Sequence, residues 1–429
     1  LACGASQTGF GRTGTVDWIT TPKVTGDSPV TGVTGKGYFL NTTAGTITVN
    51  LPAGAAGSII SMADYARTWD SNNVTVTPNG SEKIGGVNGD ATLNTEGQSV
   101  TFVYADSTQG WLNVQDSTSN VAGTTYIAAT VSGACNAIVT CGDYKTAIFK
   151  GPGTFCVSAG AGSFATADYL VVAGGGAAKS APGADNAGGG GGGFRLSNSV
   201  AGGIPAPSTS PLAAATGLTL SVQGYPIVVG AGGPNPSCGG TSPSGSVSSF
   251  DTIPSAGGGG AGQTGVGSPG GSGGGGSQGP TPTSGYAGGS GNVPCVSPPQ
   301  GKPGGAGYDG LSASNNSGGG GGAGVAGTNA SHLVGGAGGA GSYIACAMVG
   351  PTAPSYGTPG PATGRYFAGG GGGATDTSGT DGVGGAGGGG AAGNPGAGCN
   401  GTINTGGGSG GGGPTGGGSG IVMIRYKFQ

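Results

Sequence analysis

Side chains able to carry acid–base chemistry are scarce in this chain of 429 residues. Histidine is the usual general base near neutral pH, and the chain contains one, His332. Neither a carboxylate pair nor a nucleophile beside a base stands out in the sequence. The glycines after residue 173 do not match the dinucleotide-binding pattern G-x-G-x-x-G, because Lys179 occupies the third glycine position. We therefore expect a protein that is not an enzyme, with no catalytic residues, no cofactor and no metal ion.

Cysteines are the second group with possible chemistry. Their number is even and none occurs in a C-x-x-C pair, which argues against zinc and redox sites. We expect disulfides in an extracellular setting, and Cys135 and Cys141 are spaced to close a hairpin. The alternative is free thiols in a reducing cytosol. The candidate disulfide cysteines are Cys3, Cys135, Cys141, Cys156, Cys238, Cys295, Cys346 and Cys399.

Aromatic residues in the proline-rich loops of the second half are the strongest indication of a binding surface in the sequence. An exposed tyrosine offers a large contact area and loses little conformational entropy on binding. The alternative is that these rings cap the ends of glycine-rich segments. The candidate surface-recognition residues are Tyr286, Tyr308, His332, Tyr343, Tyr356, Tyr366 and Phe367.

Composition divides the chain into two regions and excludes two kinds of partner. Of the 111 glycines, 20 lie in residues 1–150 and 91 in the remaining 279 residues. Charged residues make up only 7% of the chain, and the absence of a basic cluster argues against binding to nucleic acid. Because no stretch of 18 apolar residues occurs, we expect no insertion into a membrane.

The first region is typical of short β-strands. Apolar and polar residues alternate over 46–51, 74–77 and 100–104, and 111–114 resembles a closing strand. We therefore predict a mainly β protein with an N-terminal arm (1–11), a β-rich attachment or assembly module (12–118), a β connector (119–166) and a glycine-rich domain (167–429).

Runs of glycine in the second region admit several structures. Collagen requires glycine at every third position only, so runs such as 188–193 exclude it. A flexible linker and a silk-like repeat remain alternatives. A packed bundle of polyproline-II helices is favoured, because apolar strands such as 218–222 and 421–428 interrupt and end the glycine runs. We predict packed polyglycine and polyproline-II helices with flanking β-strands.

Several motifs resemble the glycine-rich domains of bacteriophage tail-fibre and virion structural proteins. They are 168–176 (DYLVVAGGG), 188–195 (GGGGGGFR), 225–233 (YPIVVGAGG), 255–260 (SAGGGG) and 417–426 (GGSGIVMIRY), and in the first region 37–43 (GYFLNTT) and 95–100 (TEGQSV). The resemblance implies an adhesin-like protein in which a polyglycine-II lattice holds loops that touch the host receptor.

This resemblance sets the functional expectation. The chain would be a non-enzymatic virion-surface or extracellular protein whose partners are a host receptor (protein or glycan) and other virion or fibre proteins. A homo-oligomer is expected. The alternative is a structural subunit that polymerises into an extracellular filament, which an unpaired edge strand near residues 1–20 would favour.

Overall fold

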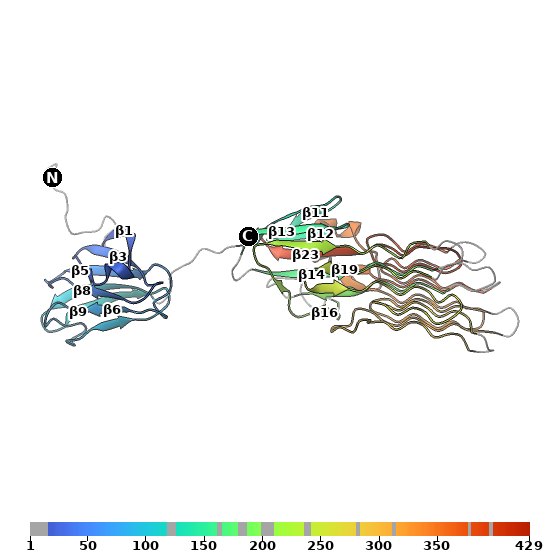
Figure 1. The fold of residues 1–429 in the computed structure, drawn as a ribbon, viewed down its shortest axis with the longest axis horizontal. Helices are drawn as coiled ribbons and strands as arrows, with labels where there is room; N and C mark the ends of the chain where they lie inside the picture. Colours follow the sequence, from blue (N-terminus) through green and yellow to red (C-terminus); the bar gives the residue numbers. More distant parts are fainter. Residues whose placement is uncertain are drawn as a thin grey trace. The chain divides into compact units, whose positions relative to one another are not determined.

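A computed structural model shows two compact units, Leu1–Gly123 and Thr124–Gln429 (Figure 1). The mainly β prediction is confirmed: helical structure in the described part is limited to the short 3₁₀ turns η1 (Thr25–Asp27), η2 (Cys346–Met348) and η3 (Gly350–Ser355). The structure describes residues 16–117, 126–160, 165–178, 187–198, 210–235, 242–279, 284–310, 315–375, 379–393 and 398–429. The expected arm 1–11 lies outside these residues.

In the first unit the chain alternates between two sheets. Each new strand pairs in parallel with the strand two places earlier, so the successive turns of chain stack as in a small β-helix. One sheet contains β1 (Asp17–Val24), β3 (Lys36–Asn41) and β5 (Ile59–Asp64), and the other contains β2 (Val30–Thr31), β4 (Ile47–Asn50) and β6 (Val74–Thr77).

Three antiparallel strands complete the first unit. β7 (Ala91–Leu93) joins the sheet of β6, while β8 (Ser99–Asp106) and β9 (Gly110–Ser117) extend the sheet of β5. The inward side chains, among them the fully buried Trp69 and Trp111, form one core. The four strands predicted in this region are therefore confirmed.

The second unit begins with a β-sandwich. The stretch interpreted above as a connector contributes four strands to it. One sheet has the order β10-β13-β18-β19-β20 and the other β11-β12-β23-β14-β15-β16, with β17 also paired to β14. The strands are β10 (Ala128–Val131), β11 (Ala137–Cys141), β12 (Tyr144–Phe149), β13 (Gly153–Ala159), β14 (Thr166–Val172), β15 (Phe194–Ser197), β16 (Ala213–Ala214), β17 (Leu218–Thr219), β18 (Gly224–Val228), β19 (Ser248–Phe250), β20 (Ile253–Ser255) and β23 (Ile421–Lys427).

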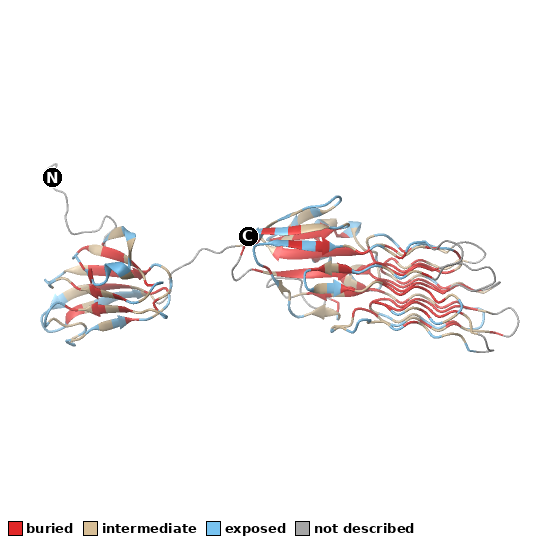
Figure 2. Cartoon of the chain, in the orientation of Figure 1, coloured by how far each residue is buried: buried red, intermediate tan, exposed pale blue. Residues whose placement is uncertain are grey.

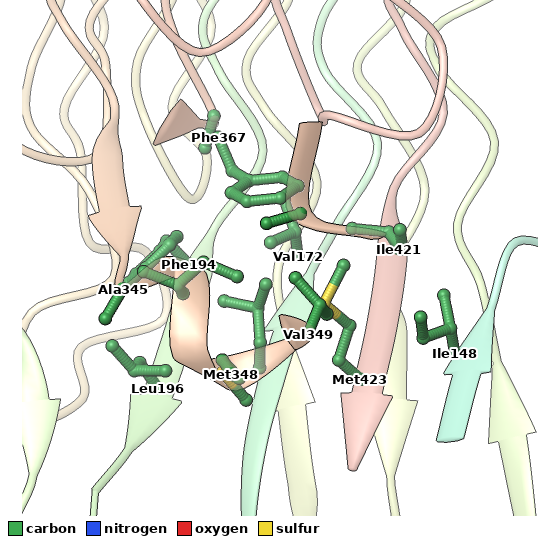
Figure 3. Close-up of a cluster of buried hydrophobic side chains, with 14 of the residues drawn as sticks. Ile148, Val172, Phe194, Leu196, Ala345, Met348, Val349, Phe367, Ile421 and Met423 are labelled. Atoms are coloured by element: carbon green, nitrogen blue, oxygen red, sulfur yellow. The ribbon is translucent and has the colours of Figure 1, made fainter. Parts of the chain in front are cut away.

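The last strand, β23, lies at the centre of its sheet, between β12 and β14. Its alternate residues enter two cores. Val422, Ile424 and Tyr426 pack in one cluster with side chains of the facing sheet, whereas Ile421 and Met423 pack on the opposite face. That face is covered by the segment 342–367, which contains β21 (Ser342–Ile344), η2, η3 and β22 (Arg365–Phe367) (Figure 3).

The glycine runs form extended rods that continue from the sandwich strands and pack side by side (Figure 1). The rod 187–193 illustrates their bonding. Gly188 and Gly191 donate backbone hydrogen bonds to one neighbouring rod, 316–322. The other four glycines donate in the same period of three to two further rods, 406–412 and 256–262, and the N···O distances are 2.7–3.1 Å. This periodicity is that of a helix with three residues per turn.

Carbonyl groups of the same rod accept bonds from three more neighbours. Gly188 O accepts from Gly275, Gly189 O from Gly371 and Gly190 O from Gly176, at 2.8 Å in each case. The rod 187–193 therefore has six hydrogen-bonded neighbours, so its buried backbone groups find partners that a single polyproline-II helix lacks. The rod interiors are buried (Figure 2). We call this packed array the glycine lattice.

Candidate binding surface at the free end of the glycine lattice

At many glycines the interior of the lattice leaves no space for a side chain, although a few small ones such as Ser272 and Ser409 are buried in it. A Cβ built on Gly188 would lie 2.0 Å from the carbonyl oxygen of Gly371, and one on Gly190 would lie 2.4 Å from that of Ser272. Both obstacles are backbone atoms, which cannot rotate away. Side chains able to bind a partner must therefore lie at the ends or on the outer faces of the lattice.

One end of the lattice is joined to the sandwich. Ser248, fully buried in β19, donates its hydroxyl to Val172 O and accepts from Gly230 N–H, both at 2.8 Å, where β14 and β18 pass into rods. The other end carries turns between rods, such as 331–334, which is closed by reciprocal hydrogen bonds between Ser331 and Val334 at 3.0 Å. We call this second end the distal surface.

Three of the seven predicted recognition residues meet at the distal surface. Tyr286 O accepts from Gly307 N–H at 3.0 Å, which places Tyr286 beside the residue preceding Tyr308. The two tyrosines are half-buried. His332 is exposed in the turn 331–334. Residues separated by up to 46 positions in sequence thus contribute to one surface.

Asn316 connects these residues. Its backbone exchanges two hydrogen bonds with Tyr308, of 2.8 and 2.9 Å, and its buried side-chain amide donates to Ser331 O at 2.7 Å. It also forms a bridge to Thr375 on a further rod. Asn316 therefore fixes Tyr308 relative to the turn that carries His332. Sequence reasoning missed this residue, although an asparagine two positions before the glycine run 318–322 is a signal for such a role.

Asp381 makes a second polar link at this surface. Its Oδ1 accepts from the backbone N–H of Thr375 at 2.9 Å and from the Thr375 hydroxyl at 3.0 Å. Because Thr375 ends one rod and Asp381 begins the next, this carboxylate holds two rods in register. Short polar side chains next to the glycine runs thus form hydrogen bonds between rods at the distal surface.

The other four predicted residues lie at the sandwich end of the lattice. Phe367 is fully buried against β14, β15 and β23 (Figure 3), and Tyr366 is 6% exposed. Tyr343 and Tyr366 pack ring against ring with centroids 5.4 Å apart, and Tyr356 packs against the same core. These four rings are therefore not gathered with Tyr286 and Tyr308, and they occupy the capping position of the alternative interpretation.

Disulfides are not formed between the described cysteines, which corrects the predicted pairing. Cys135, Cys156, Cys295, Cys346 and Cys399 are exposed free thiols, and Cys141 is a half-buried one. Cys3 and Cys238 lie outside the described residues. The predicted pair fails for a geometric reason: strand β11 (Ala137–Cys141) separates Cys135 from Cys141. At about 3.3 Å per residue, this strand exceeds the Cα separation of roughly 7 Å that a disulfide can bridge.

Two neighbouring titratable residues of β23, in the sandwich, have a shifted pKa. Burial raises the pKa of Tyr426 to about 12, and burial lowers the pKa of Arg425, whose guanidinium stacks on Tyr144 at 3.7 Å. Within the described ranges, His, Cys, Asp and Glu side chains form no group of three that could hold a metal ion. Those ranges also contain no helix with the length and apolar character needed to cross a membrane.

A family model matches most of the second unit. The family model described as "Glycine-rich domain" matches residues 146–427, which include most of the sandwich and the whole glycine lattice. A search of curated proteins found no relative.

Proposed function

We propose that this chain, which belongs to the glycine-rich domain family, is a non-enzymatic tail-fibre or virion-surface protein of a bacteriophage. In this proposal the glycine lattice displays the distal surface to a receptor, a protein or a glycan, on the host cell. The first unit attaches the protein to other virion or fibre components. The phage context derives from the motif resemblance described above.

The observation that carries the proposal is the contrast between the interior and the distal surface. The interior excludes every side chain larger than hydrogen at positions such as Gly188 and Gly190, so it offers a partner almost no side chains. At the distal surface, by contrast, Tyr286, Tyr308 and His332 are held by hydrogen bonds between different rods. A rigid support that carries chemically different side chains at one end is typical of binding proteins.

Cell binding by side-chain variants tests the proposal. We expect the triple variant Tyr286→Ala, Tyr308→Ala, His332→Ala to bind at least tenfold more weakly than the wild type to the bacteria that the wild type binds, measured with fluorescently labelled protein over a panel of strains. Tyr65→Ala is the matched control, because Tyr65 is 55% exposed on the first unit. Equal binding by the triple variant would exclude these residues as the receptor surface.

The polymerising subunit remains a second candidate, and one observation favours it. Strand β1 pairs with β3 and forms an edge of its sheet in the described structure, so its outer backbone groups are open to another strand. A second copy could add a strand there. Negative-stain electron microscopy of the purified protein separates the two candidates: discrete particles support display of the distal surface, and a continuous polymer of this chain supports the filament.

A further inference from the structure

One sheet of the first unit carries aromatic side chains on its outer face. Strands β1, β3 and β5 are neighbours in this sheet (Figure 1). Side chains alternate between the two faces of a strand, and Leu40 of β3 points into the core. Phe39 and Asn41 therefore lie on the outer face, as does Trp18 of β1, which is in register with Gly37.

Three rings and one aliphatic side chain surround Asn41. Trp18 and Phe39 are half-buried and stack with ring centroids 4.8 Å apart. Tyr65 directly follows β5 and donates its backbone N–H to Leu40 O at 3.1 Å, which places it beside Asn41; it is 55% exposed. On the other side of Asn41, Val24 of β1 is in register with it and is 45% exposed. We call Trp18, Val24, Phe39, Asn41 and Tyr65 the aromatic patch.

The polar atoms that the aromatic patch offers are hydrogen-bond donors. The indole N–H of Trp18 and the hydroxyl of Tyr65 bond to no described residue. Asn41 Oδ1 already accepts from the backbone N–H and the hydroxyl of Thr43, at 3.1 and 2.6 Å, whereas its Nδ2 donates to none of the residues that the structure describes. Solvent reaches all three donor atoms, since the buried polar atoms without a partner do not include them. Of the three groups, only the Tyr65 hydroxyl can also accept.

Rings and donors together fit a segment that presents carbonyl groups and few N–H groups. A proline-rich segment in the polyproline-II conformation has this chemistry, because proline has no N–H and the carbonyls of polyproline II form no internal hydrogen bonds. Aromatic residues line the sites that bind such segments. Along β3 the patch extends from Gly37 to Asn41, about 13 Å in a strand, which is the length of roughly four polyproline-II residues. We propose that the aromatic patch binds a proline-rich segment of another virion or fibre protein.

Two proline-rich segments of this chain are already engaged in its second unit, which favours another protein over a second copy. Pro303 O accepts from Gly327 N–H at 3.0 Å, and Pro354 O accepts from the Arg365 guanidinium at 3.1 Å. These carbonyls could bind the patch of a second copy only if those hydrogen bonds broke. The inference rests on the proposed function, in which the first unit attaches the chain to other virion or fibre components, and it identifies the attaching surface.

Fluorescence titration of the full chain with decaproline tests the inference. Trp18 is the reporter, because Trp69 and Trp111 are fully buried. We expect the tryptophan emission to change on binding, with a dissociation constant on the order of 0.1–1 mM for a contact of a few residues. The ten-residue peptide (EAAAK)₂, which contains no proline, should leave the emission unchanged.

Two variants assign the change to the aromatic patch. Tyr65→Ala should weaken decaproline binding about fivefold or more, since it removes an aromatic anchor. Tyr65→Phe removes only the hydroxyl and should weaken binding about twofold. Because Tyr65 is exposed, neither variant should lower the melting temperature. Val114→Ala is the matched control: Val114 is 60% exposed on β9, at the opposite edge of the same sheet, and this variant should bind decaproline like the wild type.

The possible outcomes separate this inference from the proposed function. No change of emission with decaproline, or equal affinity of the wild type and Tyr65→Ala, would overturn the aromatic patch as a site for proline-rich segments. A dimer in size-exclusion chromatography that Tyr65→Ala dissolves would also overturn it, because a second copy would then occupy the patch. Cell binding by the purified chain does not need attachment through the first unit, so the proposed function stands or falls with the triple variant, whatever the patch binds.

Discussion

At the residue scale, the rods of the lattice can pack closely because glycine has no Cβ atom. At Gly190 a Cβ would meet two backbone carbonyl oxygens, of Ser272 at 2.4 Å and of Gly273 at 2.7 Å. At Gly265 a Cβ would meet nothing within 4 Å. Glycine is thus essential at the first position and replaceable at the second, although both occur in the same low-complexity sequence.

This contrast gives a paired prediction. Gly190→Ala should destabilise the protein by about 3 kcal/mol or more, because surrounding backbone cannot relax in a close-packed lattice. Gly265→Ala should change the free energy of unfolding by less than about 1 kcal/mol. Denaturant unfolding of both variants measures the difference. Equal stability of the two variants would contradict the lattice contacts.

The buried Tyr426 predicts a loss of stability at alkaline pH. Its pKa is raised from 10.0 to about 12 by burial, so between pH 10 and 12 the unfolded chain releases this proton while the folded chain retains it. The stability present below pH 10 is therefore lost as pH rises, by roughly 2–3 kcal/mol at most from this group. Tyr426→Phe should reduce the loss, as unfolding curves at pH 9 and pH 11.5 would show. The same slope in both proteins would be inconsistent with this assignment.

At the scale of elements, period-two alternation made the strands predictable. The strands β4, β6 and β8 match the alternating stretches, and the two faces of β23 follow from its sequence. The segment 342–367 was not predictable as a cover over the sheet. Its buried residues, such as Met348 and Phe367, show no regular period, and their burial depends on a sheet face formed by distant strands.

This cover provides an element-scale prediction. Phe367→Ala should cost about 3–5 kcal/mol, because it opens a cavity in the core between the cover and the sheet. Phe428→Ala is the matched control, since Phe428 is only partly buried at the end of the chain, and should cost less than half as much. Thermal unfolding of the two variants measures both. A small effect of Phe367→Ala would show that the cover contributes little to stability.

At the scale of the whole molecule, the sequence indicated packed glycine helices but not which positions meet. Glycine runs are nearly identical, so nothing local indicates that the rod 187–193 lies beside 316–322, 406–412 and 256–262. The same limit explains why the sequence could not show which of the recognition residues lie together. Residue type alone grouped Tyr343 and Phe367 with Tyr286. The path of the rods, however, places Tyr343 and Phe367 at the sandwich end of the lattice and Tyr286 at the distal surface.

Photo-crosslinking tests most directly whether the distal surface contacts the host. A photoreactive phenylalanine analogue is placed at His332 on the distal surface or at Tyr65 on the first unit, both exposed, and each protein is irradiated on bacteria that bind it. If the distal surface contacts the host, we expect cross-links to a cell-surface component from position 332 and none from position 65. Cross-links to the cell only from position 65, or from position 332 only to other copies of the chain, would contradict it.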